Sequence, residues 1–353
     1  MLHIPSILRG LFTCEPRRKK TEVSPRTTRT AGMASLLIAA ALSLSACSAA
    51  TPTETKEVPA TGTVTITDNH GKVEVPVNPA RVVALDNTVF DTLSDWDVEL
   101  VAAPKGVMGS AWPEYTDDKE VLDVGNHREP NLEVVVGAQP DLIIGGYRFG
   151  DYYDELKAQS PEAIVIEINP RDGEDLMSEL QRQTEILGQI FDREDDAKAV
   201  NAELDSAIAG AKKAYNGTDT VMAVNTSAGT IGYLAPVVGR SLGPVFPALG
   251  LVPALEAEGD DDHKGNDIGV EAIAQSNPAW IIALDRDAAF APEEREAGSV
   301  PADELITGSE ALQQVQAVQQ KQIVILDPNF YLTEGIQAYI ALFGQIETAF
   351  AKA

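Results

Sequence analysis

Two stretches of this 353-residue sequence share one pattern: Glu133-Val-Val-Val-Gly-Ala-Gln-Pro140-Asp-Leu-Ile-Ile and Glu271-Ala-Ile-Ala-Gln-Ser-Asn-Pro278-Ala-Trp-Ile-Ile. In each stretch a Glu lies seven residues before a Pro, and an Ile-Ile pair follows shortly after. The apolar spacing before the Pro fits a short helix, the Pro fits a turn, and the run after it fits a buried strand. The repetition predicts two related α/β lobes with a helix, a turn and a strand at the same place.

Short apolar runs alternate with helix-like segments on both sides of these stretches. Residues 63–67 and 71–77 predict a β-hairpin, because apolar and polar residues alternate in them. The expected buried strands are 81–86, 98–103, 142–145, 163–168, 220–225, 231–234, 280–284 and 322–326. The expected helices are 88–96, 131–138, 152–159, 245–249, 270–275, 309–319 and 335–350. Alternation of this kind favours parallel sheets covered by helices.

A helical segment separates the two alternating regions. Residues 174–216 carry apolar side chains at helical spacing with no Pro, and Asn216-Gly217 follows as a stop signal. The pattern fits one long helix, or two helices with a break near 188–192. We therefore expect an N-terminal lobe at 63–173 and a C-terminal lobe at 217–353, connected by this segment.

The first 46 residues have the features of a secretory signal peptide. Basic residues from Arg17 to Arg29 precede an apolar run that is too short to span a membrane comfortably. The run ends in Leu44-Ser45-Ala46-Cys47, which resembles the bacterial lipobox, whose Cys carries a lipid anchor. We expect lipidation of Cys47 and a flexible tether at 47–62, where small polar residues dominate. An ordinary cleaved signal with a chance Cys is the alternative.

Charge and cysteine content exclude several classes of function. The chain has 27 basic and 54 acidic residues, a formal net charge of −27, which disfavours binding to nucleic acid or anionic lipid. Its two cysteines are Cys14, inside the expected signal, and Cys47. The mature domain would then have no disulfide, thiolate zinc site or cysteine nucleophile.

Four stretches are similar to the periplasmic-binding-protein family that serves iron–siderophore and vitamin B12 importers, above all its catecholate-binding branch. They are residues 79–86, 124–133, 139–144 and 326–335. The resemblance covers the chain from residue 63 to its end. It implies two Rossmann-like lobes joined by a single long α-helix. It also implies a monomeric carrier, neither an enzyme nor a holder of an intrinsic cofactor.

The same resemblance implies a place and a role. The carrier would be anchored by its lipid to the outer face of the cytoplasmic membrane. It would capture a ferric siderophore between its lobes and deliver it to a permease dimer with its ATPase. The alternatives are the same role with haem, cobalamin or a ferric hydroxamate as cargo.

The branch resembled lines its ligand site with arginines. Arg148, Arg240 and Arg286 each follow a predicted strand, where a cleft between lobes would lie. A ferric tris-catecholate carries about three negative charges, so guanidinium groups are needed to attract it to an acidic protein. Each Arg has a simpler explanation as an exposed residue paired with a nearby acid, as Asp285 and Asp287 beside Arg286 illustrate.

Three further residues are candidates for contact with the ligand. His263 and Tyr331 match positions that face the ligand in this branch. Either can donate a hydrogen bond or complete the coordination of Fe(III). Tyr147 and Phe149 beside Arg148 are possible stacking walls, and His263 alternatively belongs to a solvated polar loop. Glu334 stands where the family has small residues, and we expect a Glu there to disfavour an anionic ligand.

The repeated pair Glu133 and Glu271 matches the positions that meet permease arginines in this family. Two carboxylates at equivalent points of two lobes suit a two-fold partner. The alternative is that each Glu stabilises the first turn of its helix through the helix dipole. Glu129 is a rival for the first lobe.

Two other classes of protein are alternatives. A zinc or manganese carrier needs converging His and carboxylates, but the mature chain offers only the scattered His70, His127 and His263. An exported α/β enzyme is the second, and the sequence has no Gly-x-Ser-x-Gly elbow, Walker loop or dinucleotide fingerprint. Turnover of a substrate would indicate the enzyme, and stoichiometric binding without turnover would indicate the carrier.

Overall fold

The computed structural model describes residues 62–353. The predicted signal peptide, Cys47 and almost all of the predicted tether lie outside the described residues. Within 62–353, none of the helices combines the length and the hydropathy needed to cross a membrane.

The N lobe comprises the elements from β1 to β9 and contains a five-stranded sheet in the order β5-β4-β3-β8-β9. Its strands are β3 (Val82–Ala84), β4 (Leu100–Ala103), β5 (Leu122–Asp123), β8 (Leu142–Gly145) and β9 (Ile164–Glu167). Two hairpins flank it, β1 (Thr63–Asp68) with β2 (Gly71–Pro76) and β6 (Gly125–Asn126) with β7 (Glu129–Pro130). The helices are η1 (Asn87–Val89), α1 (Phe90–Asp95), η2 (Lys105–Val107), α2 (Pro113–Thr116), α3 (Leu132–Gly137), η3 (Tyr147–Tyr152) and α4 (Tyr153–Gln159).

The C lobe comprises the elements from β10 to α12 and contains a second five-stranded sheet, β11-β10-β13-β14, with β12 also paired to β10. Its strands are β10 (Thr220–Ser227), β11 (Thr230–Tyr233), β12 (Val252–Pro253), β13 (Trp280–Asp285) and β14 (Ile323–Ile325). The helices are α7 (Val245–Leu249), α8 (Val270–Ser276), η4 (Asp287–Ala289), α9 (Ala302–Gly308), η5 (Glu310–Leu312), α10 (Gln316–Gln320), α11 (Phe330–Thr333) and α12 (Ile336–Phe350). Residues 309–319 therefore do not form the one helix predicted, because Val315 is extended and buries its side chain.

Four parallel strands of each lobe follow the same order. In the N lobe it is β4-β3-β8-β9, with β5 added parallel at the edge, and in the C lobe it is β12-β10-β13-β14. The two stretches that share a sequence pattern form α3 with β8 and α8 with β13. The residues before their prolines, Gln139 and Asn277, have φ of +49° and +45°, so both helices end in the same left-handed turn. The prediction of two related α/β lobes is confirmed.

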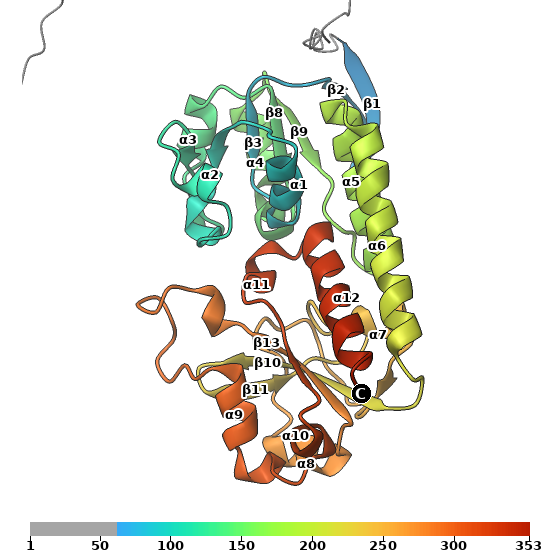
Figure 1. Ribbon diagram of the computed structural model, residues 1–353. Helices are drawn as coiled ribbons and strands as arrows, with labels where there is room; N and C mark the ends of the chain where they lie inside the picture. Colours follow the sequence, from blue (N-terminus) through green and yellow to red (C-terminus); the bar gives the residue numbers. More distant parts are fainter. Residues whose placement is uncertain (1–61) are drawn as a thin grey trace, which may run out of the picture. The chain divides into compact units, whose positions relative to one another are not determined.

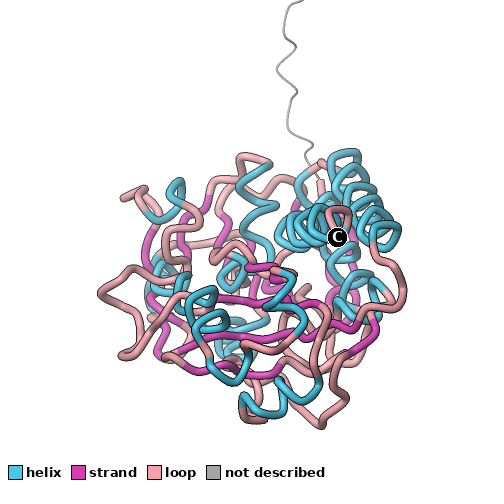
Figure 2. The backbone as a smooth tube through the Cα atoms, turned by 60° about the horizontal axis from the view of Figure 1, so that its bottom comes forward, coloured by secondary structure: helices cyan, strands magenta, loops and turns pink. Residues whose placement is uncertain are grey.

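Both sheets are buried on both faces, which explains why their strands read as continuous apolar runs. In β10, Val221 faces one cluster of buried side chains and Met222 faces the other. In β3, Val82 and Val83 separate in the same way between the two N-lobe clusters. Figure 2 shows the strands enclosed by helices.

The connecting segment differs from a single long helix. It forms two helices, α5 (Leu176–Phe191) and α6 (Glu194–Ala214), which was the second alternative. Asp192 has φ of +55° and turns the chain back, and Gln181 Nε2 of α5 donates to Asp205 Oδ1 of α6 at 2.9 Å. Gly188 permits the close turn, because a Cβ at this position would lie only 2.8 Å from the Cβ of Ala197. Each helix packs against both lobes, as Leu180 and Ile190 of α5 show.

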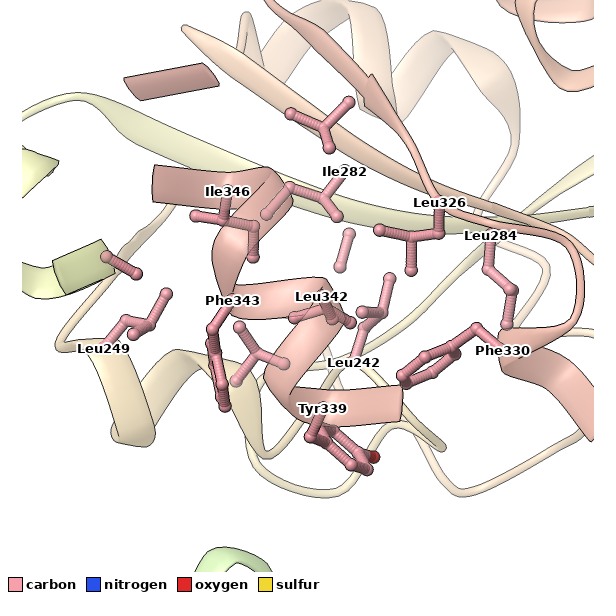
Figure 3. Close-up of a cluster of buried hydrophobic side chains, with 14 of the residues drawn as sticks. Leu242, Leu249, Ile282, Leu284, Leu326, Phe330, Tyr339, Leu342, Phe343 and Ile346 are labelled. Atoms are coloured by element: carbon pink, nitrogen blue, oxygen red, sulfur yellow. The ribbon is translucent and has the colours of Figure 1, made fainter. Parts of the chain in front are cut away.

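The last segment of the chain begins between the lobes at α11, and its α12 runs from there along the C lobe (Figure 1). On the C-lobe side, Leu342, Phe343 and Ile346 of α12 pack in the core that contains Ile282 and Leu284 of β13 (Figure 3). Toward the N lobe, two hydrogen bonds tie this segment down: Asn87 Nδ2 donates to the Leu332 carbonyl at 3.0 Å, and Gln337 Nε2 donates to Thr92 Oγ1 at 3.0 Å. The residues around α11 are therefore held by both lobes at once.

Candidate functional site

A cavity of about 520 Å³ lies between the lobes. The N lobe contributes Gly106, Val107, Asn126, His127, Arg128 and Arg148, and the C lobe contributes Arg240, His263, Arg286, Phe290, Tyr331 and Leu332. Four of these described lining residues are arginines, and none of them is Asp or Glu. Arg148 and Arg286 follow β8 and β13, which occupy the same place in the two sheets. Both arginines therefore lie in loops at the carboxyl ends of parallel strands, where ligand sites form.

Tyr331 organises the three predicted arginines. The Cζ atoms of Arg148, Arg240 and Arg286 lie 5.7, 5.8 and 5.2 Å from the centre of its ring. Arg286 Nε also donates to the Tyr331 hydroxyl at 3.2 Å. A ring that meets three cations gains cation–π attraction from each, and it keeps the guanidinium groups apart and fixed in place. Phe290 continues this aromatic wall, with its ring centre 5.9 Å from that of Tyr331.

Glu334 is the counterion of two of these arginines and lies behind them. Its carboxylate accepts from Arg240 Nε at 3.2 Å and Nη2 at 2.7 Å, and Arg148 Nη2 lies 3.5 Å away. Glu334 is 6% exposed and is not among the lining residues. Burial alone would raise the pKa of this carboxyl, but the Arg240 guanidinium above all holds the pKa below its usual value. A charged Glu334 therefore pairs with two cavity arginines without lining the cavity itself.

Acidic side chains of the C lobe neutralise the charge of Arg286. Its Nη1 lies 3.3 Å from Asp287 Oδ1 and 3.2 Å from Glu296 Oε1, and it donates to Ser227 Oγ at 3.2 Å. Its other sequence neighbour, Asp285, instead accepts from the backbone amide of Ala302 at 2.9 Å. Arg286 is therefore paired with acidic side chains, as its simpler explanation supposes, and it nevertheless lines the cavity.

Two histidines line the cavity from opposite lobes. Burial lowers the pKa of His127, and Arg148 lowers it further. Burial and Arg286 likewise lower the pKa of His263. The lowered pKa favours the neutral form of each ring, which retains a nitrogen lone pair for a donor or a metal ion. Nδ1 of His127 is buried and has no hydrogen-bond partner within the described chain.

The structure brings together five of the six predicted ligand residues: Arg148, Arg240, Arg286, His263 and Tyr331. The sixth, Tyr147, does not line the cavity, and its hydroxyl donates to Glu334. Phe149 lies in the N-lobe core, fully buried, rather than forming a stacking wall.

Three lining residues with charged, titratable or aromatic side chains were not predicted from the sequence: His127, Arg128 and Phe290. Two of them lie in the stretch 124–133 already noted for its resemblance, and that was the available signal. Phe290 follows Arg286 by one helical turn through η4, and nothing in its local sequence marks it. Across residues 62–353, no three His, Cys, Asp or Glu side chains converge on a possible metal position.

Glu133 and Glu271 occupy equivalent places on the two lobes. Each is the second residue of its helix, α3 or α8, and each is exposed. Glu129 is also exposed but belongs to the β6–β7 hairpin, which has no counterpart at this point of the C lobe.

Comparisons with known proteins agree with this architecture. The family model described as "Periplasmic binding protein" matches residues 82–330. The petrobactin-binding protein YclQ of Bacillus subtilis is 29% identical, over 76% of this chain and 81% of that protein. The ferric-anguibactin-binding protein FatB of Vibrio anguillarum is 25% identical, over 76% and 82%.

The fold is also that of a solved structure. The periplasmic catecholate-siderophore binding protein VctP of Vibrio cholerae superposes with a TM-score of 0.70 at 22% identity, covering 81% of this chain and all of that one. With the family model matched over most of the described residues, the chain belongs to the periplasmic binding protein family.

Proposed function

We propose that this chain captures a ferric siderophore, of catecholate type, between its lobes and delivers it to an ABC importer. The observation that carries the proposal is the cavity wall, in which four guanidinium groups and two aromatic rings meet without a lining carboxylate among the described residues. Guanidinium groups attract anionic oxygens bidentately, and their planar faces stack on aromatic ligands. The relatives named for petrobactin, anguibactin and catecholate siderophores support the same cargo.

Binding is tested by quenching of intrinsic fluorescence from Trp96, Trp112 and Trp280, all of which are buried. The panel is a ferric tris-catecholate, a ferric trihydroxamate, haem and cobalamin. We expect submicromolar binding of the catecholate. Preference for another member of the panel would replace the cargo and leave the carrier role intact. Binding of none of them, with turnover of a substrate, would indicate an enzyme.

The variant that tests the site is Arg128→Gln. Arg240→Ala would leave Glu334 buried without its main partner, which costs stability as well as affinity. Arg128 lines the cavity without that complication, and we expect its loss to weaken catecholate binding about tenfold, roughly 1.4 kcal/mol. Arg193→Gln is the matched control, because Arg193 lies beside the α5–α6 turn with its side chain 48% exposed. Equal effects of the two variants would contradict an arginine-lined site.

We also propose that either Tyr331 or His263 completes the coordination of Fe(III) when the siderophore leaves a position open. Both line the cavity, and phenolate and neutral imidazole are suitable ligands. Tyr331→Phe tests this role. If the phenolate binds iron, the visible absorption band of the complex shifts in the variant. An identical spectrum would restrict Tyr331 to organising the arginines.

Glu133 and Glu271 are proposed to dock the permease, one on each subunit, while lipidated Cys47 keeps the carrier at the outer face of the membrane. The equivalent, exposed positions of the two carboxylates support this docking. Glu133→Lys with Glu271→Lys should abolish stimulation of the importer's ATPase and leave siderophore affinity unchanged. Glu129→Lys is the control, and an equal loss from it would contradict the assignment.

A further inference from the structure

Glu334 carries two energetic costs at one position. It is the left-handed cap of α11 with φ of +48°, a conformation that costs energy for any residue except Gly. Its carboxylate is also buried, and burying a charge is costly unless the charge is paired. Strain of this kind persists where the surrounding structure holds the residue in place, and it is concentrated at functional sites. A Gly at this position would remove both the backbone strain and the buried charge.

The partners of Glu334 come from both lobes. Tyr147 and Arg148 belong to the N lobe, and Arg240 and Ser241 belong to the C lobe. Two of these four partners are arginines that line the ligand cavity. The carboxylate therefore stands directly behind the cationic wall, on the side away from the ligand.

The charges around the cavity show what this carboxylate does. The described wall has four guanidinium groups, and Glu334 offsets one of the pair Arg148 and Arg240. Asp287 offsets Arg286, while the negative charge of Glu296 is shared with Lys264. Two guanidinium charges then remain unbalanced, fewer than a trianionic ligand carries.

We propose that Glu334 sets the charge selectivity of the site, favouring ferric complexes with one or two negative charges over trianionic ones. This inference rests on the proposed function and narrows its substrate class. Coulomb energy scales with the product of the charges, so one carboxylate behind the wall penalises a trianion about three times as much as a monoanion. A neutral complex is affected only through the positions of the arginines.

The test compares dissociation constants for three probes. They are the ferric complexes of a hexadentate tris-catecholamide (trianionic), a tetradentate bis-catecholamide (monoanionic) and a trihydroxamate (neutral). We expect Glu334→Gln to shift the ratio of trianion to monoanion affinity about tenfold toward the trianion. Glu334→Gly should shift it in the same direction, and it remains informative if the Gln variant folds poorly, because Gly suits the left-handed backbone.

Two variants separate charge from position. Tyr147→Phe removes two hydrogen bonds of the cluster, one to Glu334 and one from Arg240, but no charge, so we expect it to change all three affinities in parallel. Glu296→Gln removes a carboxylate paired with a cavity arginine, but its side chain is 39% exposed and screened by water, so its effect on the ratio should be smaller.

The outcomes are distinct. An unchanged ratio in both Glu334 variants, with a wild-type chain that binds, overturns the selectivity proposal and leaves the carrier function standing. A wild-type chain that binds none of the ferric probes overturns both. A ratio shifted toward the trianion in the Glu334 variants, and not in Tyr147→Phe, supports the proposal.

Discussion

Glu179 of α5 is a buried carboxylate that links the N lobe to the connecting helices. It accepts from Arg171 Nη2 at 2.6 Å and Nε at 2.8 Å, and from Arg182 Nε at 3.1 Å. Arg182 in turn donates to the backbone carbonyl of Asn169 at 3.0 Å. One carboxylate thus ties the segment that leaves β9 to the start of α5. Its bonds to Arg171 above all lower the pKa of Glu179 to about 2.

We expect Glu179→Gln to lower the free energy of unfolding by about 1–2 kcal/mol at pH 7, after allowance for the half-exposed Arg171. The folded-state pKa lies below the unfolded value of 4.5, so the stabilisation is present above pH 4.5 and is lost as the pH falls toward 2. Urea unfolding should show a smaller difference in free energy of unfolding between the wild-type protein and the variant at pH 3.5 than at pH 7. A difference that is the same at both pH values would contradict an ionic origin.

The α5–α6 hairpin depends on a close approach that only glycine allows. A Cβ at Gly188 would also come within 3.2 Å of the Arg193 carbonyl, so backbone as well as side chain would have to shift. Gly344 in α12 is the opposite case, because a Cβ there would meet nothing within 4 Å. The two glycines share a helical conformation and differ only in their surroundings.

This difference predicts substitutions of opposite sign. Gly188→Ala should destabilise the protein by about 1–3 kcal/mol through overpacking of the turn. Gly344→Ala should stabilise it by about 0.5–1 kcal/mol, because Ala has the higher helix propensity. Thermal unfolding measured side by side checks both. A shift of the melting temperature in the same direction for both variants would contradict the difference in packing around the two glycines.

In the whole molecule, the lobes are joined by more than a flexible strand. Both helices of the hairpin pack against both lobes, and the segment from Tyr331 to Gln337 bonds to both. Hinges move freely where a few loop residues absorb the change in backbone angles, and packed helices resist it. The chain is therefore built for capture with little movement of one lobe against the other.

We expect the radius of gyration to fall by less than about 1 Å when a ferric siderophore binds. Small-angle X-ray scattering of the free and the saturated protein measures this change. A compaction of several ångströms would mean that the hairpin bends, and would contradict a stiff joint.

Local sequence patterns are enough to predict the two α/β lobes and most strand positions, and they single out three arginines that line the cavity. Apolar runs, helical spacing and the repeated Glu-to-Pro stretches are local signals, and a strand such as β8 or β13 is marked by its own residues. Arg148 and Arg286 could be placed at the cleft because loops after parallel strands share one edge. Arg240 also follows a predicted strand, whereas the positions of His263 and Tyr331 rested on family resemblance.

How these residues work together depends on contacts that form only in the folded chain. That Tyr331 meets three arginines, that Glu334 lies behind them, and that Phe290 lines the cavity are contacts between residues far apart in the chain. The same is true of the turn at Asp192, which depends on Gly188 meeting Ala197. Periodicity specifies which face of an element is buried, but the packing of two lobes specifies which side chains from each lobe share one cavity.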